Sequence, residues 1–206
     1  MGRKPKLLLG THNRGKVREY RVLVGAASFT ITTPIDEGVT VAVEETGATY
    51  EENASIKART YAAHSGLTAL ADDSGLEVEA LNNAPGPLSA RYAGPGAKDE
   101  EHISRLLREL ADVPWEKRAA RFVCVIALAT PSGGVELCRG ACEGIIALEP
   151  VGDSGFGYDP VFYLPDLGKT MAQLTLEEKN RISHRAAAMR RALPVLARLL
   201  QGCGQA

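Results

Sequence analysis

Apolar residues recur at strand and helix spacings along the first part of the chain. An apolar run, Lys6–Gly10, ends in a polar turn, and apolar residues at helical spacing follow over Lys16–Ala26. The segment Phe29–Thr33 is β-branched and alternating, so it predicts a second strand. The chain therefore opens as strand, loop, helix and strand.

Two further helices are predicted in the central part of the chain. Thr49 followed by Glu52 is a capping-box pattern, and Gly66 is suited to end the helix that begins there. The segment Asp99–Ala111 carries apolar residues on one helical face. Both segments are therefore expected to be helices.

The C-terminal part of the chain reads as helical. Thr175 and Glu178 form a second capping box, and the helical pattern continues to about Leu200. Pro194 removes one amide from that region, so a kink or break is expected there.

An acidic segment separates two predicted strand segments in the middle of the chain. The apolar run Thr68–Ala71 leads into Asp72–Gly75, which reads as a turn, and Leu76–Leu81 then alternates as a strand does. The carboxylates are thus expected at a strand end.

The next segments predict a hairpin followed by a long loop. Phe122–Ala129 and Val135–Leu148 flank the turn sequence PSGG. The segment Glu149–Lys169 is dense in glycine, proline and aspartate and predicts the longest loop. Loops of that length in compact domains are usually functional.

Composition narrows the class of protein. The 206 residues include 24 Lys+Arg against 25 Asp+Glu, a net charge of −1, which lacks the basic excess of a nucleic-acid-binding protein. Hydrophobic residues make up 45% of the chain, as in ordinary globular proteins. We therefore expect a globular protein that does not work mainly on nucleic acid.

Cysteine spacing and apolar run lengths indicate the compartment. The four cysteines, which form no CxxC pair, are Cys124, Cys138, Cys142 and Cys203. They are expected to be reduced thiols rather than disulfides or zinc ligands. The N-terminal apolar run is too short for a signal peptide, and no run approaches the roughly 20 residues of a membrane span. A cytoplasmic location without membrane contact is predicted.

The segment Gly10–Val17 has the G-x-x-x-x-G-K spacing of a phosphate-binding P-loop. Val17 stands where that motif needs Ser or Thr, so the match is incomplete. Asn13 and Lys16 at a helix start could still bind phosphate oxygens. An ordinary strand-to-helix turn with a solvated lysine explains the segment equally well.

Two acidic doublets are candidate metal ligands. Glu44-Glu45 and Asp72-Asp73 offer hard carboxylate oxygens, which suit a Mg²⁺ ion that also binds a substrate phosphate. One of them could also accept a proton from water. Acidic doublets that merely occupy turns are the alternative.

Aromatic and basic residues in the last third suggest a site for a planar base. Phe and Tyr stand among glycines in Gly155–Pro160, where they could stack on a base while Asp159 accepts hydrogen bonds from it. Lys179, His184 and Arg185 are mainly donors and suit phosphate or carbonyl oxygens. A loop folded on the core and a solvated basic helix remain the plainer alternatives.

Seven motifs in a fixed order resemble the inosine triphosphate pyrophosphatase family. They are T-x-N-x-x-K at Thr11–Lys16, EETG at Glu44–Gly47, ENAxxKA at Glu52–Ala58, ADDSGL at Ala71–Leu76, SARYAG at Ser89–Gly94, GFGYDP at Gly155–Pro160 and EEKxxxSHR at Glu177–Arg185. The resemblance covers nearly the whole chain. It implies a Mg²⁺-dependent enzyme that converts ITP, dITP or XTP to the monophosphate and pyrophosphate.

The resemblance also implies roles for individual residues. Glu44 and Asp73 would hold Mg²⁺, and Asp73 would also be the catalytic proton acceptor. Substrate-binding roles fall on Thr11, His12, Asn13, Arg14, Gly15, Lys16, Asn53, Lys57, Ser74, Phe156, Gly157, Tyr158, Asp159, Lys179, His184 and Arg185. Asn53 and Lys57 are four residues apart and therefore share one helix face.

We expect an α/β fold with a long mixed sheet flanked by helices, forming a single two-lobed domain over residues 1–206 with a central substrate cleft. The resemblance implies a homodimer. Two other functions stay open: a P-loop-like NTPase or phosphotransferase that uses Gly10–Val17 with Asp72, and a nucleotide-binding protein without catalysis.

Overall fold

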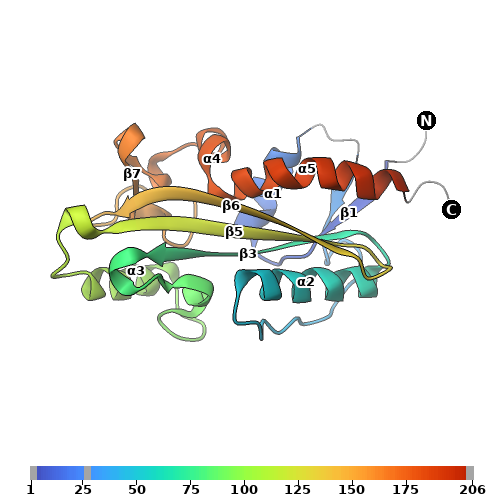
Figure 1. The fold of residues 1–206 in the computed structure, drawn as a ribbon, viewed down its shortest axis with the longest axis horizontal. Coiled ribbons are helices and arrows are strands. Elements are labelled where there is room, and N and C mark those ends of the chain that lie inside the picture. Colours follow the sequence, from blue (N-terminus) through green and yellow to red (C-terminus); the bar gives the residue numbers. More distant parts are fainter. Residues whose placement is uncertain (1–3, 26–28, 203–206) are drawn as a thin grey trace. The chain divides into compact units, whose positions relative to one another are not determined.

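The fold was analysed in a computed structural model, which describes residues 4–25 and 29–202. The strands are β1 (Lys6–Leu9), β2 (Thr30–Thr32), β3 (Ala69–Val78), β4 (Ala84–Pro85), β5 (Ala119–Ala129), β6 (Val135–Ile146), β7 (Phe162–Leu164) and β8 (Lys169–Thr170). The α-helices are α1 (Arg14–Val24), α2 (Tyr50–Ser65), α3 (Asp99–Glu109), α4 (Leu176–Ile182) and α5 (His184–Gly202). Figure 1 shows these elements along the chain.

The strands form one eight-stranded sheet in the order β2-β1-β3-β5-β6-β7-β8, with β4 paired to β3. Strand β1 runs parallel to β2 and β3, whereas the β3–β4, β6–β7 and β7–β8 pairs are antiparallel. The expected α/β fold with a long mixed sheet flanked by helices is confirmed.

The chain divides into two compact units. The first comprises the described residues within 1–73, 124–140 and 185–206, and the second comprises 74–123 and 141–184. Strands β3, β5 and β6 contribute residues to both. The single two-lobed domain with a central cleft stays a prediction.

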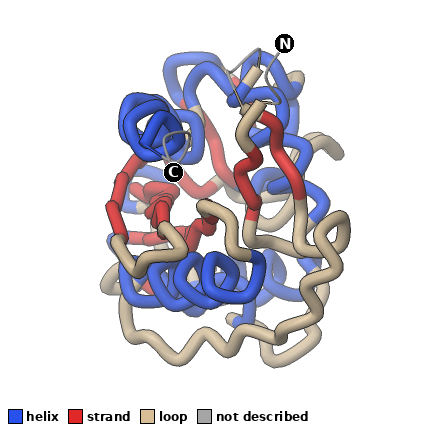
Figure 2. The backbone as a smooth tube through the Cα atoms, turned by 90° about the vertical axis from the view of Figure 1, so that its right-hand side faces the viewer, coloured by secondary structure: helices blue, strands red, loops and turns tan. Residues whose placement is uncertain are grey.

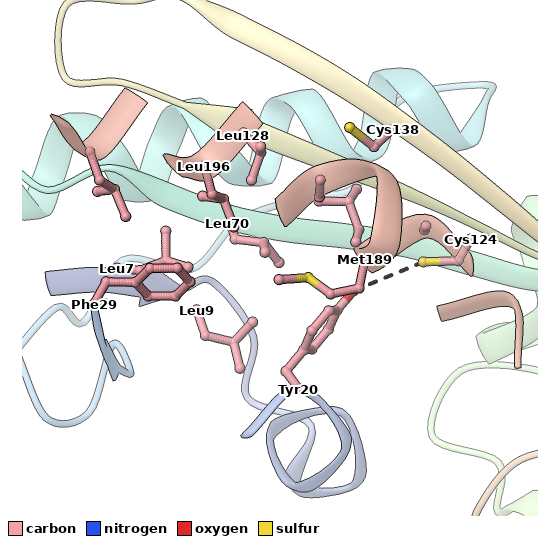
Figure 3. Packing of buried hydrophobic residues seen from close by; sticks show 14 residues of the cluster. Leu7, Leu9, Tyr20, Phe29, Leu70, Cys124, Leu128, Cys138, Met189 and Leu196 are labelled. Carbon is pink, nitrogen blue, oxygen red and sulfur yellow. Dashed lines mark hydrogen bonds between the residues drawn. The ribbon is translucent and has the colours of Figure 1, made fainter. Parts of the chain in front are cut away.

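The core of the first unit is built on the alternation of its strands. Leu7, Leu9 and Leu70 pack with Tyr20 of α1 and Met189 of α5 (Figure 3). Helix α2 covers the other face of these strands, as Figures 1 and 2 show. Because neighbouring residues of a strand face opposite sides, each strand here supplies apolar side chains to both helix layers.

The core of the second unit packs α3 against the strands. Ile103 and Leu106 of α3 are buried in the same cluster as Phe122 of β5 and Phe162 of β7. The rings of Phe122 and Phe162 have centroids 4.2 Å apart. This amphipathic packing confirms the predicted helix that begins at Asp99.

Helix α2 begins and ends as the sequence predicts. The Thr49 hydroxyl accepts the Glu52 amide at 3.2 Å, and the Glu52 carboxylate accepts the amide of Thr49. Gly66 ends the helix in the left-handed conformation. Both signals are local, which is why they could be read without the fold.

The acidic segment Asp72–Gly75 is not a turn. It lies inside β3, a strand of 10 residues whose side chains are buried at every position except Ser74. The prediction was wrong because charged residues are uncommon inside strands, and here tertiary partners compensate their charge.

The long loop expected over residues 149–169 also contains structure that was not predicted. Strand β7 and the start of β8 fall within it. These strands have only two or three residues, so no alternation can develop in the sequence.

The break in the C-terminal helical region occurs at Ser183, not at Pro194. Ser183 has an extended ψ of 156° and separates α4 from α5, whereas Pro194 lies inside α5. Of the kink or break expected at Pro194, the break is therefore wrong, and the kink stays a prediction. Ala192 and Leu196 on either side of it are buried, so packing holds the helix together.

Three cysteines can be placed. Cys124, Cys138 and Cys142 are free thiols, as predicted. Cys203 lies outside the described residues, and so does Ala26, the expected end of the first helix. None of the helices in the described part of the chain is long and apolar enough to cross a membrane.

Candidate active site

Two adjacent carboxylates of β3 face different helices. Asp72 contacts residues of α1 and α5, whereas Asp73 contacts residues of α2. This is the alternation expected of neighbouring positions in a strand. Their exposed fractions are only 2% and 6%, so each needs compensating partners.

Asp72 lies among positive charges in the first unit. Its Oδ2 atom is 3.0 Å from Lys16 Nζ and 3.5 Å from Arg185 Nε. Burial alone would raise the pKa of Asp72, but the charges of Lys16 and Arg185 outweigh it and hold that pKa well below its usual value. This favours the ionised form of Asp72, and its buried Oδ1 atom has no hydrogen-bond partner among the described residues.

A second carboxylate shares Arg185. Glu19 Oε2 lies 2.5 Å from Arg185 Nη1, and both side chains are almost fully buried. Burial lowers the pKa of Arg185, but Glu19 and Asp72 raise it by more, so the guanidinium stays charged. Close by, the Cys124 thiol is 3.7 Å from Asp72 Oδ2, and burial followed by the Asp72 charge raises the pKa of that thiol to about 12.

Asp73 has different partners, which come from α2. Lys57 Nζ lies 3.1 Å from Asp73 Oδ1, and Asn53 Nδ2 donates to Oδ2 at 3.4 Å. Burial raises the pKa of Asp73 by more than the charge of Lys57 lowers it. Asp73 is consequently the better proton acceptor of the two neighbours.

Lys57 links Asp73 to the acidic doublet. Its Nζ atom lies 2.6 Å from Glu45 Oε1, whereas Glu44 is exposed. Burial lowers the pKa of Lys57, but the charges of Asp73, Asp72 and Glu45 raise it by more, so the ammonium is retained. The doublet therefore approaches Asp73 through Glu45.

Gly47, which follows the doublet, allows a close approach to α2. Its amide donates to Asn53 Oδ1 at 2.8 Å, and a Cβ atom there would lie 2.6 Å from the Cβ of Glu52. Glycine is thus required where this segment meets the helix. Asn53 joins the segment to Asp73 through the two ends of one amide.

The predicted phosphate-binding segment forms the start of α1. The Asn13 side chain accepts the Lys16 amide at 3.1 Å and caps the helix. Thr11 Oγ1 accepts the Asn13 amide at 3.2 Å, and exposed His12 has its ring centroid 6.3 Å from that of Tyr61. Arg14 and Gly15 occupy the first helical turn, where amides lack intrahelical partners.

The second unit contains the predicted base-binding loop. Lys179 Nζ lies 2.5 Å from Asp159 Oδ2, and both side chains are buried. The same ammonium is 4.9 Å from the centre of the Phe156 ring. Gly155 passes so close to Asp159 that an added Cβ would lie 2.0 Å from its Oδ2 atom.

Further contacts hold this loop within the second unit. The Gly157 amide donates to Asp99 Oδ2 at 2.6 Å, and the Tyr158 hydroxyl donates to the Ser89 carbonyl at 2.9 Å. His184 is buried with its ring stacked on Phe122, centroids 4.8 Å apart. Aromatic and charged groups of the loop are therefore fixed by neighbours outside it.

The comparisons with known proteins identify the family. The sequence model of the Ham1 family matches residues 7–195. The chain belongs to the Ham1 family. A dITP/XTP pyrophosphatase of Symbiobacterium thermophilum is 51% identical over 95% of this Ham1 chain and 97% of the relative. A dITP/XTP pyrophosphatase of Halalkalibacterium halodurans is 48% identical over 89% of this chain and 94% of the relative.

Solved structures agree with the Ham1 assignment. A HAM1 protein from Coxiella burnetii is 43% identical, covers 94% of this chain and 99% of its own, and has a TM-score of 0.85. The Ham1 protein of Staphylococcus aureus is 41% identical over 93% of this chain and 98% of its own, with a TM-score of 0.83. The resemblance found from seven motifs is thus confirmed at the level of the family.

The structure of this Ham1 chain brings some of the predicted site residues into contact and assigns others to different units. Asn53 and Lys57 meet at Asp73, but Lys179 and His184 belong to the second unit and Arg185 to the first. Ser74 is a half-buried residue of β3, next to Asp73.

Sequence reasoning assigned no role to three of the partners found in this Ham1 chain, buried Glu19 and Cys124 and exposed Asp99. Glu19 lies three residues after Lys16 on α1, and this i, i+3 spacing is the one signal that could have indicated it. Cys124 and Asp99 have no such local signal, because their partners are distant in the sequence.

Proposed function

We propose that the protein hydrolyses noncanonical purine nucleoside triphosphates, namely ITP, dITP and XTP, to the monophosphate and pyrophosphate. The names of the Ham1 relatives support this reaction. The observation that carries the proposal is the Asp73 carboxylate, buried beside the ammonium of Lys57 and the amide of Asn53. That arrangement combines a proton acceptor with a neighbouring positive charge.

In the proposed reaction, a water oxygen forms a bond to the α-phosphorus and the bond from that phosphorus to pyrophosphate breaks. Asp73 accepts the proton of the attacking water. Lys57 and Lys16 oppose the negative charge that develops on the leaving pyrophosphate. Asp72 holds Lys16 by its charge, and no covalent intermediate with the chain is required.

We propose that the reaction also uses a Mg²⁺ ion. Asp73 and the doublet Glu44-Glu45 would hold it, since Mg²⁺ needs only one or two protein carboxylates when substrate phosphates complete its coordination. Glu45 and Asp73 already converge, because both carboxylates contact the Nζ atom of Lys57, at 2.6 and 3.1 Å. When bound, the ion would polarise the phosphoryl oxygens.

The doublet can be tested one residue at a time. Glu44→Gln and Glu45→Gln are compared for the Mg²⁺ concentration that gives half-maximal activity. A role in metal binding raises that concentration for at least one variant. If both variants respond to Mg²⁺ as the wild type does, the doublet does not bind the ion.

The base would be bound by the aromatic loop of the second unit. Phe156 would stack on the purine, and Asp159, fixed by Lys179, would accept hydrogen bonds from its edge. Thr11, His12, Asn13, Arg14 and Gly15 would contact the phosphates. His184 and Arg185 would donate to a 6-oxo group, which adenine lacks, and such mismatched donors discriminate strongly.

A homodimer and a cytoplasmic location belong to the same proposal. Both come from the resemblance and from composition. Sedimentation of the purified protein checks the first, and a monomer at micromolar concentration would contradict it.

Product analysis tests the proposed reaction. The purified protein is incubated with Mg²⁺ and separately with ITP, XTP, GTP and ATP, and the products are resolved by ion exchange. Monophosphate and pyrophosphate from ITP or XTP, with ATP and GTP largely spared, are expected. Diphosphate with orthophosphate would instead support the P-loop reaction, and binding without turnover would support the non-catalytic alternative.

A further inference from the structure

We propose that Asp99 is a positioning residue for the base-binding loop, acting through the amide of Gly157. This inference rests on the proposed function, because it gives Asp99 a share in the affinity for the purine without contact to it. The observation is one short bond, in which the Gly157 amide donates to Asp99 Oδ2 at 2.6 Å across 58 residues of sequence.

Hydrogen bonds within the loop link Phe156 to Asp159. The Phe156 amide donates to Asp159 Oδ2 at 2.9 Å, and the Asp159 amide reaches the Phe156 carbonyl only at 3.4 Å. Gly157 has φ +63° and no atom within 4 Å of where its Cβ would lie. The Gly157 Cα faces open space, and the hydrogen bond of its amide ties this peptide to Asp99, a residue outside the loop.

Asp99 is well placed to hold that peptide. It is the first residue of α3, whose Ile103 and Leu106 side chains are buried in the core of the second unit. Three residues along the same face, His102 Nδ1 accepts the Ala93 amide at 2.9 Å, and its ring lies 6.2 Å from the Tyr158 ring. The helix is thus anchored, and its carboxylate makes a charge-assisted bond to the loop.

The loop is consequently clamped at two points. Lys179 holds Asp159 on one side of Phe156, and Asp99 holds Gly157 on the other. Without Asp99, the Gly157 amide would bond to water and the Phe156 ring would sample more orientations before binding. Ordering the loop would then reduce the affinity for the base, while contacts to the phosphates would be unchanged.

Neighbouring Glu100 provides a matched control. It is exposed, carries the same charge in the same helical turn, and its own backbone carbonyl accepts a bond from Ser104. Glu101 is less suitable, because its carboxylate caps the helix by accepting the Lys98 amide at 2.7 Å. Glu100→Ala therefore reproduces the loss of charge at the helix start without touching the loop.

The experiment compares full-length wild type, Asp99→Ala, Asp99→Asn, Glu100→Ala and Phe156→Ala. It measures KM and kcat with ITP, the inhibition constant of inorganic triphosphate, which has no base, and the thermal midpoint. Asp99→Ala is expected to raise KM about tenfold, the equivalent of one charge-assisted hydrogen bond. The values of kcat and of the triphosphate inhibition constant should stay close to those of the wild type.

The other variants show whether a change in KM comes from the loss of the Asp99 hydrogen bond. Phe156→Ala should raise KM at least as much, Asp99→Asn should recover part of the loss because its amide oxygen can still accept, and Glu100→Ala should resemble wild type. An unchanged KM in Asp99→Ala, or equal rises in KM and in the triphosphate inhibition constant, would overturn the role of Asp99. If the wild type does not cleave ITP, the proposed function fails. The role of Asp99 is then tested by calorimetric titration with ITP. Equal binding by the wild type and Asp99→Ala, or no binding by either, overturns that role.

Discussion

Asp72 and Asp73 are consecutive residues of β3, but they have different neighbours. On the side of α1 and α5, Asp72 meets two cations, Lys16 and Arg185. On the side of α2, Asp73 meets one cation, Lys57, which is shared with Glu45. Burial raises the pKa of both carboxyls. For Asp72 the charges of Lys16, Arg185 and Lys57 outweigh burial, so its pKa falls. For Asp73 the charges of Lys57 and Lys16 do not, and the Glu45 carboxylate raises the pKa further.

The two carboxylates therefore have different roles. Asp72 provides a fixed negative charge that holds cations in place, whereas Asp73 can exchange a proton. Asp72 stays ionised and fixes Lys16 and Arg185. Asp73 has one cation, Lys57, in direct contact, so accepting a proton disrupts fewer ion pairs than it would at Asp72. Strand alternation thus gives two adjacent residues of the same type two different environments.

The largest effect is expected from Asp73→Asn. Loss of the proton acceptor should lower kcat about 10³-fold, measured as pyrophosphate released from ITP with Mg²⁺. The thermal midpoint should stay near that of the wild type, and Asp112→Asn, at an exposed position, is the control. Full activity in Asp73→Asn would refute the assignment of the acceptor.

Asp72→Asn should mainly affect stability. It leaves Lys16 without its buried counter-charge and Arg185 with Glu19 alone, which costs about 3–5 kcal/mol in the free energy of unfolding. Urea denaturation of this variant beside Asp73→Asn measures the difference. Equal losses in the two variants would contradict the contrast between the two sides of β3.

Lys57→Met should lower kcat about 100-fold, since one fixed charge near the developing negative charge is lost. Lys57→Arg should restore part of the activity. Lys6→Met, which breaks an ion pair with Glu37 elsewhere in the first unit, serves as the control. Turnover by Lys57→Met at the wild-type rate would remove Lys57 from the reaction.

The smallest effect is expected from Cys124→Ala. Removal of this buried thiol should cost about 1 kcal/mol of unfolding free energy, with little change in kcat. Cys138→Ala, in the same core cluster but without a contact to Asp72, is the matched control. A loss in Cys124→Ala that approaches that of Asp72→Asn would mean that the thiol is a principal partner of Asp72.

The sequence predicted those parts of the fold that depend on local signals. The capping box at Thr49 and the amphipathic pattern after Asp99 both gave helices at the expected positions. The acidic residues of β3 read as a turn because their stabilising cations come from other elements. Strand β7 was missed because three residues are too few for a pattern.

The sequence predicted which residues belong to the site, but not which of them contact one another. Motif order identified Lys16, Asn53, Lys57 and Asp73, and the structure adds which partner each one meets. It also shows that the break at Ser183 comes just before Arg185, whose guanidinium is bound by Glu19 and Asp72. Such partners depend on distances through space that sequence spacing does not encode.

The close approach of Gly155 to Asp159 bears on how the base-binding loop can diverge. In a saturation library selected for activity, the Gly155 codon should lose every substitution, because its φ of +81° is strained for other residues and any Cβ collides with the carboxylate. Gly157 has the same sign of φ but open space around it, so asparagine and aspartate should persist there. After selection, the Gly155 codon would therefore encode glycine alone, whereas the Gly157 codon, two positions later, would tolerate substitutions.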